Sequence, residues 1–288
     1  MGKGIWIWAA VLAGVATAAG AGSIKEEVHK QAEASMLVTG TVQVNQDGTV
    51  QGYTLDKPDQ LPAPVVQLIA KNVPHWTFQH PPTTDPVYTT SMSLRLLADP
   101  VDGDNFRLTI QGASFGDKGT ASGETVSMKS RIPPRYPQEA ARAGVSGTVY
   151  LLLRVGRDGH VEDVIAEQVN LDQYASRGVM NHFRDTLSNA ALDVARQWTF
   201  NTPTQGGEVD APYWVARVPV AFNLNKPNSA GEPRRYGTWR MYIPGPRQVA
   251  PWVKDQRLLA TAPDAVADDG LHTLGTGLQL TSPLGSGG

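Results

Sequence analysis

The residues that could do chemistry are few, and their spacing favours no common active site. Gly112 to Gly116 reads Gly-Ala-Ser-Phe-Gly, which matches the nucleophile turn of serine hydrolases. That turn needs a helix directly after the serine, whereas residues 117–120 have the composition of a loop. We therefore expect Ser114 to have no catalytic role and the protein not to be an enzyme.

Metal and redox chemistry are also disfavoured. The chain has no cysteine and six histidines, and no two histidines have the spacing of a helical zinc motif. His75, beside Trp76, is typical of a residue that ends a helix. We expect no metal site and no cofactor. The net charge of −2 over 288 residues gives no basic field, so we expect no nucleic-acid partner.

The first 22 residues have the composition of a targeting segment. An apolar run follows Lys3 and passes into small residues, and Ala19-Gly20-Ala21 fits a secretory cleavage site. The alternative is an uncleaved membrane anchor over residues 5–22, at the short end of the ~17–25 residues that a spanning helix needs. Under both interpretations the rest of the chain lies outside the cytoplasm.

The most informative pattern is a sequence that occurs twice. Each copy contains a Gly-Thr-Val, an Asp-Gly and a Trp-Thr-Phe motif in the same order. These motifs begin at Gly40, Asp47 and Trp76 in the first copy and at Gly147, Asp158 and Trp198 in the second. Such a repeat indicates one structural unit used twice. We expect the Asp-Gly motifs in hairpin turns and both tryptophans in a core between helix and sheet.

Alternating apolar residues predict strands in each copy, and helical periodicity predicts the connecting helices. In the first copy we expect a hairpin over 38–55, a helix over 61–73 and strands over 87–96 and 105–111. In the second we expect helices over 138–143 and 186–198, a hairpin over 149–169 and a last strand over 213–224. The fold class is α+β, with two tandem units. Each unit is a three-stranded antiparallel sheet (β-hairpin, helix, strand) with the helix packed on one face.

The same patterns divide the chain into six segments. We expect a targeting segment or anchor over 1–22, a first unit over 37–112, a linker over 113–130, a second unit over 131–226, a packed extension over 227–257 and a disordered tail over 258–288. The extension contains aromatic residues that can pack on a domain. The tail is rich in Ala, Gly, Thr and Asp, a composition that buries little apolar surface.

An ordered set of motifs in the second unit is typical of a known family. Tyr136-Pro137 precedes a short helix, the three repeated motifs follow, and the last strand carries Val218-Pro219-Val220. Over Ile132 to Leu224 this set resembles the C-terminal domain of TonB-type energy transducers. The first unit, over about 37–97, is similar to a second and more diverged copy, which lacks the Tyr-Pro motif.

The resemblance implies a periplasmic binding function. Domains of this type take up a short extended peptide, the TonB box of an outer-membrane transporter, as a strand added beside their last strand. By this resemblance the docking strand carries Val215, Arg217, Pro219, Ala221 and Asn223, and Arg135, Tyr136 and Pro137 lie near the path of the peptide. Pro219 also fits an exposed sheet edge, because proline has no N–H for a central position. The same proline and the strand arginine could equally protect an edge from unwanted pairing.

Other parts of the chain depart from a complete energy transducer. Residues 5–22 contain no His, Ser, Asp or Glu to engage a proton-driven motor, and residues 23–35 are too few for a long spacer. Three interpretations stay open: a periplasmic protein that docks a transporter peptide and supports energy-dependent transport, a true transducer anchored in the inner membrane that also contacts motor proteins there, and a structural envelope protein that forms a homodimer through its sheet edges.

Overall fold

The computed structural model describes residues 32–79, 85–102, 105–116, 123–224, 236–253, 262–266, 270–275 and 278–285. Over these residues the fold is α+β, with many strands and few helices. The strands form a five-stranded sheet, a four-stranded sheet and a two-stranded ribbon. The expected targeting segment or anchor lies outside the described residues. None of the described helices has the length and apolar character needed to cross a membrane.

The first sheet is built around β1 (Glu33–Asn45), in which every second residue from Ala34 to Val44 is buried. On one side β1 pairs antiparallel with β3 (Val87–Asp102), and β4 (Asn105–Phe115) follows beyond it. On the other side β1 pairs with β2 (Val50–Leu55) and β10 (Arg240–Tyr242). Helix α2 (Ala63–Asn72) covers one face of this sheet. The 3-10 turns Pro58–Gln60 and Val73–His75 flank it.

The second sheet has the order β11-β9-β6-β7. Its strands are β6 (Gly147–Gly156), β7 (Val161–Leu171), β9 (Tyr213–Phe222) and β11 (His272–Leu274). Helix α4 (Arg177–Ala195) packs on one face through an apolar core, with α3 (Gln138–Arg142) beside it. A separate ribbon pairs β5 (Ser127–Ser130) with β8 (Thr199–Asn201).

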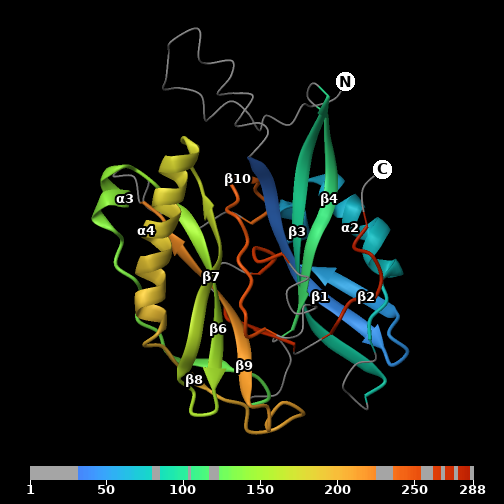
Figure 1. The fold of residues 1–288 in the computed structure, drawn as a ribbon. Helices are drawn as coiled ribbons and strands as arrows, with labels where there is room; N and C mark the ends of the chain where they lie inside the picture. The colour runs from blue at the N-terminus through green and yellow to red at the C-terminus, as the bar shows by residue number, and fades with distance from the viewer. Residues whose placement is uncertain are drawn as a thin grey trace.

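C-terminal segments up to residue 275 lie between the two sheets, and residues 278–285 pack on the first unit. Figure 1 shows α4 and α2 on the two outer sides, the orange and the first red segments in the middle, and the last red segment, residues 278–285, beside α2. Residues 250–253 bury Ala250, Trp252 and Val253 against the helix-free face of the second sheet. Asp264 contacts Arg95 of the first sheet and Asn170 of the second. The C-terminal part of the chain therefore makes contacts with both sheets.

The repeated motifs make the same contacts in both sheets. Gly48 and Gly159 have positive φ angles of +85° and +77°, and an added Cβ would lie 2.2 Å from the carbonyl oxygen of Phe78 or Phe200. In each copy the phenylalanine N–H donates to the turn glycine oxygen at 2.8 Å. The preceding tryptophans of both copies are buried, as predicted.

Several elements differ from their predicted bounds. Helix α4 begins nine positions earlier than expected because Met180 and Phe183 continue its buried face. Strand β4 runs on to Phe115 and β5 lies within residues 127–130, so strands occupy both ends of the expected linker. The largest difference is in the tail. Residues that we predicted to be disordered form β11 and bury Ala265 and Leu278. The few apolar side chains of the tail pack partly on the second sheet and partly on the first unit. No single stretch of the tail therefore has the apolar composition from which a core element could be predicted.

Gly159 and Gly178 offer a matched test of the turn. Replacing Gly159 by alanine should destabilise the protein by about 1–2 kcal/mol from the backbone alone, and further through the Cβ clash. The control, Gly178→Ala in α4, meets no atom within 4 Å and should be neutral or gain up to about 1 kcal/mol. Urea denaturation measures both free energies of unfolding. Equal stability of the two variants would contradict the constrained turn.

Candidate partner-binding site on strand β9

Strand β9 lies between two different environments. Trp214, Ala216 and Val218 belong to the core beneath helix α4, and this alternation continues to Phe222. Val215 faces the other side and packs with Leu152 and the segment that carries Trp252. Both faces of the strand are covered, because its residues on the α4 face are all apolar and Val215 packs on the opposite face. Only its edges remain for recognition of another strand.

One edge of β9 pairs with β6, and the other points away from it. Pro219 has no N–H to donate to β6, and its carbonyl oxygen accepts a hydrogen bond from Arg131 Nη2 at 3.1 Å. The backbone of Pro219 therefore faces the outer edge. Because backbone groups alternate in direction along an antiparallel strand, those of Val215, Arg217 and Ala221 face the outer edge as well.

Part of the outer edge is occupied by the chain itself. Strand β11 pairs antiparallel with β9, with His272 opposite Arg217 and Leu274 opposite Val215. The sequence predicted an exposed edge, and the structure corrects this for the first half of β9. The physical reason is that an open edge leaves backbone donors and acceptors unpaired, and the tail supplies partners for them. Ala221, beyond this pairing, is exposed.

The side chain of Arg217 is fully buried. Its Nε and Nη2 donate to the two carboxylate oxygens of Glu167 at 2.7 and 2.9 Å. Arg247 donates to Glu167 Oε1 from the partly exposed side at 2.6 Å. Glu167 is the extra residue of a bulge in β7, which directs its side chain toward β9. A buried arginine needs such a carboxylate, so in this structure the side chain of Arg217 is a buried partner of Glu167 inside the sheet and does not reach the outer edge.

The Arg-Tyr-Pro motif lies at the other end of β9. The ring of Tyr136 meets Phe222 edge-on, with ring centres 5.6 Å apart, and its hydroxyl donates to the carbonyl oxygen of Val145. Burial raises the pKa of this tyrosine above its ordinary value, so the hydroxyl remains a donor at neutral pH. Pro137 caps helix α3, and Arg135 is exposed.

The predicted residues of the last strand thus fall into two groups, one on each side of Pro219. Val215 and Arg217 lie in the part of β9 that pairs with β11. Ala221 and Asn223 are exposed near the end of the strand where Tyr136 packs. Pro219 is buried between the two groups and holds the guanidinium of Arg131 on its carbonyl oxygen.

Sequence reasoning missed three contributors to this edge: Arg131, Glu167 and the β11 segment. Leu271 and Leu274 are the signal that could have revealed β11. They pack on opposite faces of the second sheet, as a short added strand requires. The pattern is too short to stand out in a tail rich in glycine. Ser114 lies inside β4 opposite Ser93, a position unlike a strand-to-helix nucleophile turn.

Comparison with known proteins identifies the domain that contains this strand. Residues 132–224 match the family model of the Gram-negative bacterial TonB protein C-terminal. This confirms the resemblance predicted from the sequence over the same residues. The TonB-like domain begins just before Tyr136 and ends just after β9. The first sheet, β10 and β11 lie outside the match.

Two curated relatives carry the name Protein TonB, and both come from strains of Xanthomonas campestris pv. campestris. Each is 42% identical over 100 residues, which is 35% of this chain and 39% of the relative. The chain therefore matches well under half the length of these TonB proteins. No solved structure gives a significant match.

The buried ion pair generates a prediction about stability. Replacing Arg217 by methionine should cost about 3–5 kcal/mol, because it removes a buried partner of Glu167. Arg247→Met, the control at the partly exposed partner, should cost clearly less. The double variant Glu167→Leu with Arg217→Met should recover much of the loss, because no buried charge of the pair remains. Urea denaturation compares the three. An unchanged free energy of unfolding in Arg217→Met would contradict the structural role.

Proposed function

We propose that this protein is a periplasmic TonB-type docking protein. It binds an extended peptide segment of an outer-membrane transporter, the TonB box, as a strand on the outer edge of β9, and so supports energy-dependent transport. The observation that carries the proposal is the family match at residues 132–224, whose last strand has backbone groups directed outward. Strand addition uses such groups for affinity and alternate side chains for selectivity.

The edge itself supports this mode of binding. Strand β11 already lies there as an antiparallel strand, so the backbone of β9 has a geometry that accepts one. The pairing covers only Val215 to Arg217. A longer peptide that continues past Pro219 to Ala221 would gain further backbone contacts. Docking in this manner requires β11 to leave.

We further propose that the first unit is a second, diverged copy of the same domain. In both copies the turn aspartate accepts a backbone N–H two residues on, from Thr49 at 2.9 Å or His160 at 3.0 Å. The strand equivalent to β9 is β3. Met92 is equivalent to Phe222, because each pairs with the glycine of its Gly-Thr-Val motif. Strand β4 pairs with β3 from Met92 to Asp102, beyond the stretch that is equivalent to Val215–Ala221. We assign peptide docking to the second copy because the TonB family model matches that copy.

Localisation follows from the same proposal. The chain is placed in the periplasm, either released by cleavage near Gly22 or held in the inner membrane by residues 5–22. The function is one of binding and requires no catalytic residue or cofactor. N-terminal mass spectrometry of the protein from cells tests this part: a mature start near Gly22 supports release, and an intact N-terminus in the membrane fraction supports the anchor.

Titration with TonB-box peptides tests the docking function. The full-length mature protein should bind them with saturation in the micromolar range, as a shift in amide resonances of β9 or a calorimetric signal. Ala221→Pro should weaken binding by about 2–10-fold, because it removes an outward N–H worth about 0.5–1.5 kcal/mol. The control Ala221→Val keeps that N–H and should bind like the wild type.

Absence of binding at high micromolar peptide, with the protein folded, would contradict docking. If the same protein instead formed a stable homodimer through its sheet edges, the result would favour a structural role in the cell envelope over peptide docking. Equal peptide affinity in Ala221→Pro and Ala221→Val would show that the outer edge of β9 is not the docking strand.

A further inference from the structure

The first unit holds a segment of the C-terminal tail along its Trp-Thr-Phe motif. We call residues 76–79 the ledge. Phe78 and Leu280 form an antiparallel bridge. Thr281 N–H donates to the carbonyl oxygen of Thr77 at 2.8 Å, and the two hydroxyl groups lie 2.9 Å apart. Gln79 N–H donates to the oxygen of Gln279 at 2.9 Å. The tail thus adds a short strand to the ledge.

The second unit has the same arrangement, made by a different part of the chain. There β5 pairs with β8, and Met128 stands opposite Phe200. Trp198 Nε1 donates to the oxygen of Ile132 at 2.9 Å, and in the first unit Trp76 Nε1 donates to the oxygen of Leu284 at 3.2 Å.

The tail also repeats the apolar spacing of the segment that precedes the second unit. The three apolar positions of each segment have identical spacing: Val126, Met128 and Ile132 before the second unit, and Leu278, Leu280 and Leu284 in the tail. Val126 and Leu278 are both buried in the cores of their respective units. The end of the chain therefore supplies the first unit with the strand that the second unit receives from its own N-terminal side.

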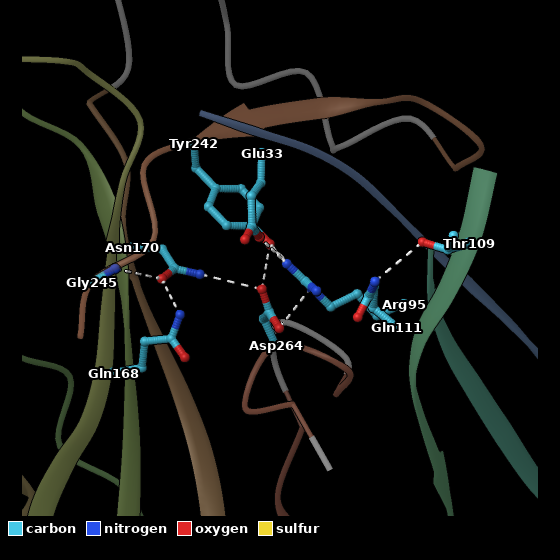
Figure 2. Close-up of polar contacts among 9 residues, drawn as sticks. All are labelled: Glu33, Arg95, Thr109, Gln111, Gln168, Asn170, Tyr242, Gly245 and Asp264. Atoms are coloured by element: carbon cyan, nitrogen blue, oxygen red, sulfur yellow. Dashed lines mark hydrogen bonds and ion pairs between the residues drawn. The ribbon is translucent and has the colours of Figure 1, made fainter. Parts of the chain in front are cut away.

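The tail is also held upstream of β11. Asp264 Oδ1 lies 2.7 Å from Arg95 Nε of β3, and Tyr242 donates its hydroxyl to the same carboxylate. Figure 2 shows Asp264 between Arg95 and Asn170, which reaches it from the second sheet. Burial and the nearby carboxylate raise the pKa of Tyr242, so its hydroxyl stays protonated as a donor. The adjacent residues Ala265 and Val266 are buried.

Strand β11 lies between these two attachments. We propose that the first unit holds the tail at two places, where residues 279–281 pair with the ledge and where Asp264 pairs with Arg95. These two attachments keep residues 271–274 on the outer edge of β9, where they exclude a partner strand. The exclusion of a transporter peptide rests on the proposed function. The anchoring itself does not, because it concerns contacts within the chain.

Short pairing alone does not explain the occupancy of this edge. A strand of three residues makes few backbone bonds, each worth about 0.5–1.5 kcal/mol net, and ordering its backbone costs about as much. Fixing both flanks removes most of that ordering cost and raises the effective concentration of the segment at the edge. A substitution that weakens the pairing of the tail with the ledge of the first unit should therefore release β11 from the second unit.

Amide hydrogen exchange of the full chain tests this coupling. Thr281→Pro removes the N–H that bonds Thr77, and Leu280→Asp places a charge in the apolar contact of the ledge strand. Both should raise exchange in peptides covering residues 213–219 by about tenfold, although neither residue touches β9. The control Thr281→Ala keeps the N–H and loses only the hydroxyl contacts with Thr77, so it should raise exchange of β9 much less than Thr281→Pro.

Binding of a synthetic peptide with the sequence of residues 270–275 gives a second readout. It should bind the two ledge variants at least several-fold more tightly than the wild type, because the internal competitor is weakened. Leu274→Asp, which disrupts β11 directly, should show the same gain. If amide exchange of β9 is unchanged in both Thr281→Pro and Leu280→Asp, with the protein folded, the proposal that the first unit holds β11 in place is wrong. If the 270–275 peptide binds and TonB-box peptides do not, that proposal stands and the proposed function fails.

Discussion

The structure depends on how the outer edge of β9 is satisfied. A strand edge exposes backbone donors and acceptors that pair with any suitable strand. On this edge Pro219 removes one donor, Arg131 covers one acceptor, and β11 pairs with the residues from Val215 to Arg217. The remaining end of the strand, at Ala221, is exposed. An edge that is filled by a short, replaceable strand is protected from aggregation and can still accept a partner.

Polar contacts between the two sheets direct the tail toward the outer edge of β9. Charged groups are buried there in pairs, as low-dielectric surroundings require. Glu167 neutralises Arg217 inside the second sheet, and Arg95 of the first sheet pairs with Asp264 of the tail and with Glu33. Asn170 joins the second sheet to Asp264. These polar contacts fix the path of the tail between two apolar cores that would otherwise be independent.

Local sequence patterns predicted much of the fold and less of the site. The hairpins at Gly48 and Gly159, both buried tryptophans and the alternation of β9 follow from short-range rules and agree with the structure. The contribution of β11 and the ion pair of Arg217 depend on contacts between distant segments. Arg217 illustrates the difficulty, because a strand arginine has the same sequence signature whether it meets a peptide or a buried carboxylate. The spacing of Leu278, Leu280 and Leu284 carried a signal, but it becomes readable only beside residues 126–132.

A reversible cross-link between β9 and β11 tests whether a peptide can dock only where β11 leaves the outer edge of β9. The chain has no cysteine, and Ala216 stands opposite Thr273. Their backbone groups face away from each other, and such pairs have Cα atoms about 4.5 Å apart, within disulfide range. In the double variant Ala216→Cys with Thr273→Cys, the oxidised protein should lose binding of TonB-box peptides, and reduction should restore it. Equal peptide affinity in the oxidised and reduced forms would contradict docking at the edge that β11 occupies.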